Sequence, residues 1–371
     1  MDSVHFIRQL QSIFVDPAVE KDPQTKSILS RINADITKVC RPIEVFEFIN
    51  QAEDPIEAGK KVLFLTQNRG RFLRSCPGTK HYECCRYMIL HVGTYCPMDC
   101  AYCILQTFFH PPVLQYFVNH DVMDAELTHF FSTTSFRRIG TGEYTDSLIW
   151  SGWTPLVEKL VNRFGRQKRV ALELKTKTNN VAELEHLDHN RKTIMAWSLN
   201  SETVIAANEI GTASLQTRLE AASRCQAWGY PLAFHFDPII VQEDAEETYR
   251  AVVDRLFDCI DPENIAWISL GTFRCVPPLK SVIQRRFPES DFIYGEFVSG
   301  LDGKMRYFKP LRTNIYRSII QAIRSRAPRV AVYFCMESRD VWERALGFTA
   351  GADSALADRL DARAVKLCRL T

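Results

Sequence analysis

The hydrophobic positions change their spacing along the chain, and from residue 86 onward they form short runs separated by amphipathic segments. Six apolar runs of strand length alternate with stretches whose apolar residues recur every three or four positions. This alternation predicts a parallel α/β sheet, and its length predicts a partial (β/α)6 TIM-like barrel. Residues 330–338 are a further strand candidate. The six runs are residues 87–93, 136–143, 169–176, 193–200, 230–240 and 265–273.

Two regions flank the predicted barrel. In residues 1–60 the apolar positions recur at helical spacing, which predicts a small helical cap. Near the other end, Asp302-Gly303 is a tight-turn signal between two strand-like segments, which predicts a hairpin. We therefore expect three regions: 1–85, a helical N-terminal cap with a Cys-rich end; 86–290, the barrel; and 291–371, a C-terminal region with a basic hairpin, a final strand and a helix.

Composition narrows the class of protein. The chain has 371 residues, of which 46% are hydrophobic and 24% charged, and this is typical of an ordered globular protein. It contains no apolar run of about 18 residues and begins without a basic segment leading into an apolar core. We therefore expect a cytoplasmic protein without a membrane span. There, 12 cysteines favour metal binding or thiol chemistry over disulfides.

The stretch CPMDCAYC contains Cys96, Cys100 and Cys103 and directly follows the first predicted barrel strand. The carboxyl ends of barrel strands are where active sites form. Three thiolates are one short of a closed tetrahedral zinc site, so either His91 or His110 completes a zinc site or the metal keeps an open position. A four-iron cluster held by three cysteines has such a position.

A second cysteine group, Cys76, Cys84 and Cys85, precedes the same strand. These residues could ligate another metal or have structural roles, and the sequence does not decide between the two. Adjacent cysteines bind one metal poorly, which favours the structural role.

The C-x3-C-x2-C motif with an aromatic residue before its last Cys resembles that of the radical S-adenosylmethionine enzymes. The motif continues as CILQTFFHPPVLQYFVN and is followed by KTK, AWSLN, FHFDPII, ISLGTFR, DGKMRYF and VYFCMES. In this order the segments resemble the spore photoproduct lyase family over roughly residues 70–348. The resemblance implies a DNA-repair lyase that uses a [4Fe-4S] cluster and S-adenosyl-L-methionine to form a 5′-deoxyadenosyl radical, with a reducing partner such as flavodoxin or ferredoxin.

The same resemblance assigns cofactor contacts to residues at strand ends. Lys177 follows the third strand and Ser198 ends the fourth, and both match positions that hold the cofactor in spore photoproduct lyases. Thr145 and Asp146 follow the second strand and match a Ser-Asp pair near the cofactor. Asp146 could also cap the helix that follows it.

Two positions depart from the family pattern. Glu143, in GTGEYTD, stands where the family has the Cys that returns a hydrogen atom to the thymine radical, and Ile104 replaces a Tyr of the relay. Gly-Thr-Gly-Glu resembles the Gly-Gly-Glu element whose Glu binds the methionine ammonium, so we expect Glu143 to bind the cofactor. The hydrogen must then come from elsewhere, and the candidates are Tyr102, Cys275 and Cys335.

A basic run near the C-terminus is the candidate DNA-binding element. Residues 304–329 contain eight Lys or Arg and no acid, with aromatic residues interleaved. Basic side chains neutralise phosphates and aromatic rings stack on bases, so a hairpin of this composition could present a flipped lesion. A solvated helix face is the alternative. The DNA-contact candidates are Lys304, Arg306, Tyr307, Lys309 and Arg312.

Three classes of function remain open. The first is a radical S-adenosylmethionine enzyme acting on DNA, in particular on a pyrimidine photolesion. The second is an enzyme of the same fold acting on a different substrate. The third is a non-catalytic protein that binds a metal or nucleic acid. The lesion, the hydrogen donor and the oligomeric state are not determined by the sequence.

Overall fold

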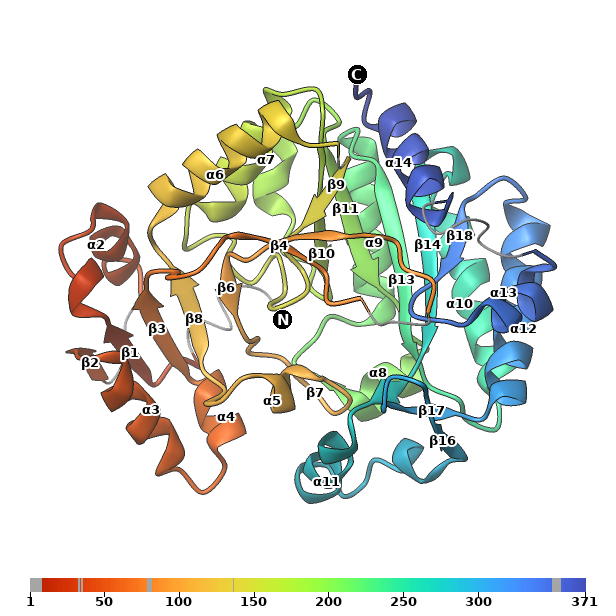
Figure 1. Cartoon of the computed structure of the whole chain (residues 1–371), viewed down its shortest axis with the longest axis horizontal. Coiled ribbons are helices and arrows are strands. Elements are labelled where there is room, and N and C mark those ends of the chain that lie inside the picture. Colours follow the sequence, from red (N-terminus) through yellow and green to blue (C-terminus); the bar gives the residue numbers. More distant parts are fainter. Residues whose placement is uncertain (1–8, 33, 35, 79–81, 136, 349–354) are drawn as a thin grey trace.

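Two sheets organise the chain: an eight-stranded sheet curled into a half barrel, and a five-stranded sheet beside it (Figure 1). The computed structural model describes residues 9–32, 34, 36–78, 82–135, 137–348 and 355–371. Among these residues, no helix is long and apolar enough to cross a membrane.

The eight-stranded sheet confirms the predicted barrel. Its order is β18-β14-β13-β11-β10-β9-β5-β4, and every neighbouring pair is parallel except β4 and β5. All six predicted strands are present, and the further candidate forms the edge strand β18. The strands are β4 (Leu73–Ser75), β5 (Met88–Leu90), β9 (Arg138–Gly140), β10 (Ala171–Thr176), β11 (Thr193–Ser198), β13 (Leu232–Ile239), β14 (Ile265–Thr272) and β18 (Val332–Phe334).

Amphipathic helices cover the outer face of this sheet (Figure 1). In α7 (Leu156–Gly165) the buried residues Leu156, Leu160 and Phe164 recur every fourth position, which places them on one face of the helix. The other long helices are α6 (His120–Thr133), α9 (Leu215–Ala227), α10 (Ala245–Cys259), α12 (Lys309–Arg326) and α14 (Ala355–Leu367). The shorter ones are α2 (Pro23–Leu29), α3 (Pro42–Asn50), α4 (Pro55–Lys60), α5 (Leu105–Phe108), α8 (Glu202–Asn208), α11 (Pro277–Arg286) and α13 (Arg339–Leu346), with 3-10 turns at Pro17–Val19, Ala182–His186, Pro262–Asn264 and Phe292–Tyr294.

The prediction of a purely helical N-terminal region is wrong. The five-stranded sheet has the order β2-β1-β3-β8-β6 and takes three of its strands from this region. In β1 all four residues are buried, and a short, fully buried strand has no period-two pattern that would distinguish it from a buried helix. The strands are β1 (Ser12–Val15), β2 (Ile36–Val39), β3 (Val62–Thr66), β6 (Gly93–Thr94) and β8 (Leu114–Phe117).

Described residues between β4 and β5 contact the other end of the eight-stranded sheet and the C-terminal hairpin. The backbone N–H of Glu83 donates to the carbonyl of Glu337, just past β18, at 3.0 Å. The Tyr82 hydroxyl accepts from the N–H of Leu301, at the tip of the C-terminal hairpin, at 3.1 Å.

The predicted hairpin at Asp302-Gly303 is confirmed. The strands β16 (Phe297–Ser299) and β17 (Met305–Tyr307) pair antiparallel, and β15 (Arg274–Cys275) pairs with the other edge of β17. Gly303 has φ of +75°, a conformation that most other residues avoid. The hairpin lies beside the carboxyl end of β14.

Candidate active site

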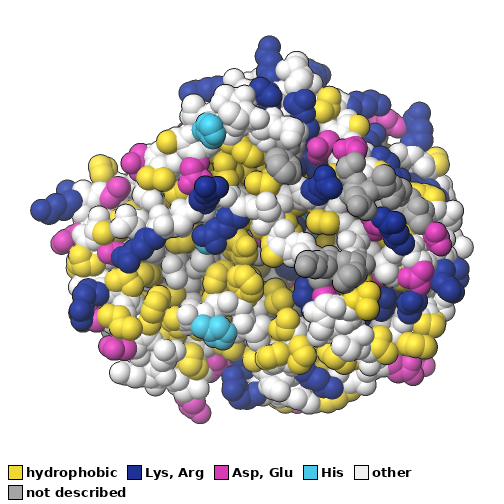
Figure 2. Space-filling view, viewed as in Figure 1, with side chains coloured by type: hydrophobic (Ala, Val, Ile, Leu, Met, Phe, Trp, Pro, Cys, Tyr) yellow, Lys and Arg dark blue, Asp and Glu magenta, His cyan; other side chains and the backbone are white. Residues whose placement is uncertain are grey.

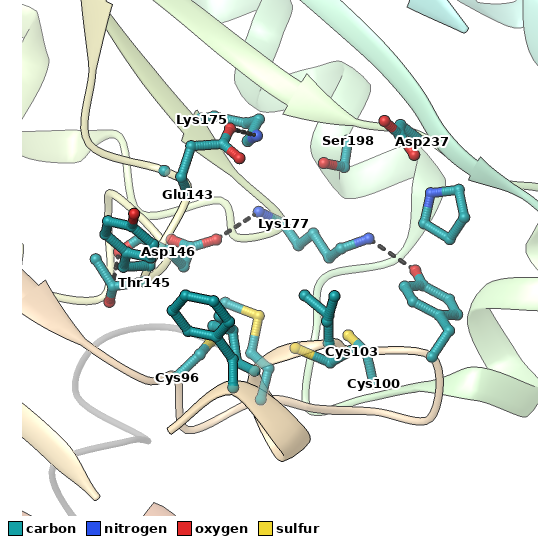
Figure 3. Close-up of a pocket in the computed structure, with 18 of the residues that line it drawn as sticks. Cys96, Cys100, Cys103, Glu143, Thr145, Asp146, Lys175, Lys177, Ser198 and Asp237 are labelled. Atoms are coloured by element: carbon teal, nitrogen blue, oxygen red, sulfur yellow. Dashed lines mark hydrogen bonds and ion pairs between the residues drawn. The ribbon is translucent and has the colours of Figure 1, made fainter. Parts of the chain in front are cut away.

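A cavity of about 490 Å³ opens at the carboxyl ends of the barrel strands. Its wall takes side chains from the carboxyl ends of β10, β11 and β13 and from the segments that follow β9, β10 and β14, and the cysteine loop lines it as well. This arrangement is where TIM-like barrels place their chemistry. The polar lining includes Glu143, Thr145, Asp146, Lys175, Lys177, Ser198, Asp237 and Arg274, most of which are drawn in Figure 3.

Cys96, Cys100 and Cys103 all line this cavity, with their sulfur atoms on one side of it (Figure 3). Within the described part of the chain, no three His, Cys, Asp or Glu side chains are grouped tightly enough to hold one metal ion. This finding does not support the zinc alternative with His91 or His110. A four-iron cluster binds each thiolate at a different iron atom, so three spread thiols fit it.

Charged side chains from two other regions hold the cysteine loop in place. The buried Lys60, at the end of α4, donates to the carbonyls of Cys96 at 3.2 Å and Met98 at 2.6 Å. Arg286, at the end of α11, makes two 2.9 Å bonds to the carboxylate of Asp99. A site whose supporting groups are fixed in this way is ready to bind its metal without rearrangement.

Lys177 lies above the loop and joins it to a buried ion-pair network. Its Nζ donates to the Tyr102 hydroxyl at 2.8 Å and to Glu209 at 3.1 Å. The Tyr102 hydroxyl donates in turn to Glu209, and Arg218 donates to the same carboxylate at 2.5 Å. Burial alone would raise the pKa of Glu209, but the cations Arg218 and Lys177 outweigh it and hold that pKa below its ordinary value.

Glu209 also ties the network to the cysteine loop through the backbone. It begins the short strand β12 (Glu209–Ile210), which pairs antiparallel with β7 (Asp99–Cys100). The sequence analysis missed Glu209, because a Glu at the end of a helical segment carries no local signal of burial.

Both carboxylate oxygens of Asp146 accept hydrogen bonds from other groups of the chain. One carboxylate oxygen accepts from the N–H of Leu148 at 2.9 Å and from the Thr176 hydroxyl at 2.8 Å, and the other accepts from the N–H of Lys177 at 2.8 Å. Asp146 therefore fixes the position of Lys177 relative to the loop after β9. Thr145, next to it, is buried on the cavity wall.

Glu143 faces Lys175 across the cavity wall (Figure 3). The Lys175 ammonium lies 2.5 Å from one Glu143 carboxylate oxygen, and the pair is about one quarter to one third exposed. Burial would lower the pKa of Lys175, but Glu143 outweighs this and raises it. Glu143 therefore has a cation partner inside the chain, and among the described residues none donates a hydrogen bond to its second oxygen.

The three predicted hydrogen donors differ in whether they line the cavity. Tyr102 lines the cavity, whereas Cys275 and Cys335 do not belong to its wall. Cys275 packs in a buried cluster with Phe273 and Tyr307. Cys335 accepts from Arg274 at 3.5 Å. The assignment of a hydrogen donor among Tyr102, Cys275 and Cys335 therefore stays a prediction.

Asp237 and Arg274 form a further pair on the wall that the sequence analysis did not nominate. The guanidinium makes two 3.1 Å bonds to the carboxylate. Both residues lie in strand-end motifs, FHFDPII and GTFR. Their position at strand ends could have indicated that they line the cavity.

The predicted basic surface does not form as expected. Arg306 and Arg312 are buried, paired with Asp302 and Glu337 respectively, and Tyr307 is buried as well. Lys309 is exposed and lies 2.7 Å from Asp340. Glu337 and Asp340 follow the run in the sequence, whereas Asp302 lies just ahead of it, so a charge count confined to residues 304–329 missed all three acids.

Lys304 is the exception in that run, because it lines the cavity. Its Nζ is 3.8 Å from Asp302, whose carboxylate is already bonded to Arg306, and 3.8 Å from the Met336 sulfur.

A half barrel with a C-x3-C-x2-C loop at its strand ends defines the class: the chain is a radical S-adenosylmethionine enzyme, a class that uses a [4Fe-4S] cluster and S-adenosyl-L-methionine. More specifically, it belongs to the spore photoproduct lyase family, whose family model matches residues 78–307. The three thiols fit the cluster, and Glu143 and Lys177 are complementary to the ammonium and carboxylate of the cofactor.

Relatives and solved structures agree with this assignment. The spore photoproduct lyase of Bacillus subtilis (strain 168) is 29% identical over 255 residues, covering 65% of this chain and 70% of the relative. That of Geobacillus sp. (strain Y412MC61) is 29% identical over 213 residues, covering 54% and 60%. A solved spore photoproduct lyase variant with bound AdoMet and dinucleoside spore photoproduct superposes with a TM-score of 0.76 at 23% identity, over 88% of this chain and 98% of that chain.

Proposed function

We propose that this enzyme repairs a thymine photolesion in DNA, namely the spore photoproduct for which its relatives are named. The observation that carries the proposal is the cavity at the strand ends, in which three cysteines face a wall of polar side chains. The chemistry supplied there by the bound cluster and S-adenosylmethionine is a 5′-deoxyadenosyl radical.

Different residues of the chain bind the cluster and orient the cofactor. Cys96, Cys100 and Cys103 hold the cluster. Lys177 and Ser198, which Figure 3 shows across the cavity from the cysteines, orient the cofactor. Lys177 already has its position set by Asp146 and Tyr102, so little rotamer entropy is lost when a carboxylate binds it.

Further residues complete the proposed cofactor site. Glu143 offers its second carboxylate oxygen to the methionine ammonium, and Thr145 lies beside it on the cavity wall. A one-electron donor of the flavodoxin or ferredoxin class supplies the reducing electron.

The mouth of the cavity suits an extrahelical base. Phe108 is half exposed and stacks on Tyr144, with ring centroids 5.8 Å apart and planes at 16°, and both residues line the cavity. Figure 2 shows hydrophobic side chains at the centre of this face with Lys and Arg around them. Aromatic rings stack on bases and cations attract phosphates, so lesion-containing DNA is the expected partner.

Anaerobic reconstitution with iron and sulfide tests the proposal. We expect the enzyme to cleave S-adenosylmethionine to 5′-deoxyadenosine and to convert the spore photoproduct dinucleotide to two thymines, detected by mass. Each of Cys96→Ala, Cys100→Ala and Cys103→Ala should abolish both activities, because two thiolates do not hold the cluster. Cys259→Ser is the matched control, since Cys259 is exposed on α10.

Two results would contradict the proposal. Cofactor cleavage that persists in any of the three variants would refute the cluster site. The second result is a wild-type enzyme that cleaves S-adenosylmethionine and leaves the dinucleotide unconverted while converting another irradiated pyrimidine dimer. That result would show that the other dimer, and not the spore photoproduct, is the substrate.

A further inference from the structure

The second cysteine group of the sequence, Cys76, Cys84 and Cys85, lies outside the catalytic loop. Cys76 lines the cavity, whereas Cys84 and Cys85 lie outside its wall and are partly exposed. Among the described residues, no three metal-binding side chains are grouped closely enough for a metal ion, so a second metal site at these cysteines is not supported. The adjacent thiols Cys84 and Cys85 are instead placed for chemistry with each other.

Cys84 and Cys85 are hydrogen-bonded to each other, and the Cys85 thiol donates to the Cys84 sulfur. The Cys84 sulfur also accepts from the backbone N–H of Arg86 at 3.4 Å. It packs against the backbone of Gly78, where an added Cβ would come within 2.9 Å of the sulfur. Two donors therefore converge on one partly exposed sulfur atom, and such an arrangement stabilises a thiolate.

The turn that contains Arg86 is strained. Arg86 has φ of +52°, in the left-handed region that residues with a side chain rarely adopt. Neighbouring bonds hold the turn in place, because Arg138 donates to the carbonyl of Cys85 at 2.7 Å and the N–H of Cys76 donates to the carbonyl of Tyr87 at 2.9 Å. Strained backbone that is fixed in this way is found at functional sites.

The groups around Cys84 keep its sulfur deprotonated at neutral pH. The hydrogen bond from Cys85 has the largest effect and, together with Arg86 and the positive charge of Arg138, outweighs burial and lowers the pKa of Cys84 to about 6. The same bond, together with burial, raises the pKa of Cys85, so that Cys85 stays a thiol. Further titratable groups near this pair or near Arg138 are Cys76, Cys335 and Asp361.

We propose that Cys84 and Cys85 form a thiol–disulfide exchange site that reacts with low-molecular-weight disulfides. The Cys84 thiolate attacks one sulfur of the disulfide, whose S–S bond breaks, so that one half is bonded to Cys84 and the other leaves as a thiolate. Cys85 then has no thiolate to donate to, and its proton passes through solvent to the leaving thiolate. The Cys85 sulfur attacks Cys84 and releases the second half. Two electrons have then passed from the two cysteines to the disulfide.

The bond formed between Cys84 and Cys85 is reversible because of its geometry. Consecutive Cα atoms are about 3.8 Å apart, whereas disulfides ordinarily join Cα atoms about 4.4–6.8 Å apart. The bond is therefore strained and easily reduced, as regulatory disulfides are. Its formation displaces the peptide between the two cysteines, and the nearby Tyr87 is bonded to Cys76 on the cavity wall. Oxidation should therefore weaken the binding of the cofactor in the cavity.

Glutathione disulfide added to the anaerobically reconstituted enzyme tests this site. At pH 6 we expect Cys84 to react about tenfold faster than an ordinary cysteine, because its larger thiolate fraction outweighs the lower nucleophilicity of a low-pKa thiolate. The wild-type enzyme should release two glutathione molecules and gain a disulfide. Cys84→Ser should lose the fast reaction. Cys85→Ala should react about tenfold more slowly and stop with one glutathione attached to Cys84. Cys259→Ser, at an exposed site, is the control and should match the wild type.

Peptide mapping by mass locates the disulfide in the wild-type enzyme and needs no variant. A first disulfide between other cysteines, such as Cys76 and Cys84, would overturn the inference, and so would wild-type kinetics in Cys84→Ser. This test is independent of which lesion the enzyme repairs.

Equilibrium binding of S-adenosylmethionine tests the link to the cavity. The dissociation constant of the oxidised wild-type enzyme should rise severalfold and return when dithiothreitol is added. Cys84→Ser should keep one value with and without glutathione disulfide. A dissociation constant that is the same before and after oxidation of the wild type would overturn the link between the exchange site and the cavity.

Discussion

Glu143 and Asp146, two acidic residues in the loop after β9, differ in how many hydrogen bonds their carboxylates accept from the chain. Asp146 accepts from two backbone N–H groups and one hydroxyl, so its role is to position the strand end. Glu143 has one ion-pair partner among the described residues, Lys175, which lies against one of its two oxygens. The hydrogen bonding of the two carboxylates therefore favours Glu143 over Asp146 as the residue that contacts the cofactor.

Glu143→Gln should raise the dissociation constant for S-adenosylmethionine by about ten- to a hundredfold, because a charge-assisted hydrogen bond contributes roughly 1.5–3 kcal/mol. Equilibrium binding of S-adenosylmethionine to the reconstituted enzyme measures this dissociation constant. Glu183→Gln, at an exposed site, should change nothing. An unchanged constant for Glu143→Gln would show that this carboxylate serves only Lys175.

At the scale of elements, short pieces of structure hold the cysteine loop and the hairpin. The strand β12 pairs with β7 for only two residues, yet it brings the carboxylate of Glu209 against Arg218, Lys177 and Tyr102. In the hairpin, the tight turn brings Asp302 back against Arg306. Both elements bury an ion pair. In the hairpin, this pairing makes Arg306 unavailable to a partner, although the sequence presents it as part of a basic patch.

Glu209→Gln should lower the free energy of unfolding at neutral pH by about 3 kcal/mol, because it leaves buried cations without their anion. Since cations hold the pKa of Glu209 below its ordinary 4.5, the stability that its ionised form contributes is complete above that value and is lost as the pH falls below it. Urea unfolding between pH 7 and pH 4 should therefore show a flatter pH dependence in the variant than in the wild type.

The exposed Glu202, which pairs with Arg255, offers a matched control for this measurement. Glu202→Gln should keep both the stability and the pH profile of the wild type. A Glu209→Gln profile parallel to the wild-type profile would contradict the assignment of that pH dependence to Glu209.

Lys304→Ala should weaken duplex DNA binding and reduce the slope of log K against log salt by about 0.9, as expected for the loss of one phosphate contact. Replacing Arg306 would instead disrupt the hairpin, because Arg306 is buried against Asp302. Arg329→Ala is the control, since Arg329 is exposed and pairs with Glu263 in the 3-10 turn before β14. Equal slopes for Lys304→Ala and the wild type would exclude a phosphate contact at Lys304.

At the scale of the whole molecule, the cysteine loop lies between two sheets. The chain passes from β5 in the half barrel to β6 in the five-stranded sheet just before Cys96. Conversely, β4, from the N-terminal third, belongs to the barrel sheet. The boundary predicted at residue 85 is thus crossed by both sheets, and whether residues 1–85 fold as a separate unit stays a prediction.

Arg286 connects these regions, since it bonds Asp99 in the loop and Asp54, at 2.7 Å, ahead of α4. Arg286→Ala should lower the free energy of unfolding by about 2 kcal/mol, because hydrogen bonds to charged groups contribute roughly 1.5–3 kcal/mol. It should also speed the loss of iron to a chelator. Denaturant unfolding and the visible absorbance of the cluster measure the two effects.

The neighbouring Arg285 is exposed, so Arg285→Ala is the control for the Arg286 measurement and should leave both quantities at wild-type values. Iron release from Arg286→Ala at the wild-type rate would show that Lys60 and β12 alone secure the loop.

The sequence by itself determined the barrel strands and the place of the cysteine loop at their carboxyl ends. Hydrophobic period and residue spacing are local properties, so β9 to β14 and the Cys96 loop could be predicted without knowing their partners. The tertiary structure alone decided the strands of residues 1–66, the ion pairs that bury Arg306 and Arg312, and the position of Cys76 on the cavity wall. Most of these depend on pairing between segments distant in the chain, such as Arg312 with Glu337, and a local pattern carries no record of such pairing. The pair of Arg306 with Asp302 is local in sequence, but the hairpin had to form before the two side chains met.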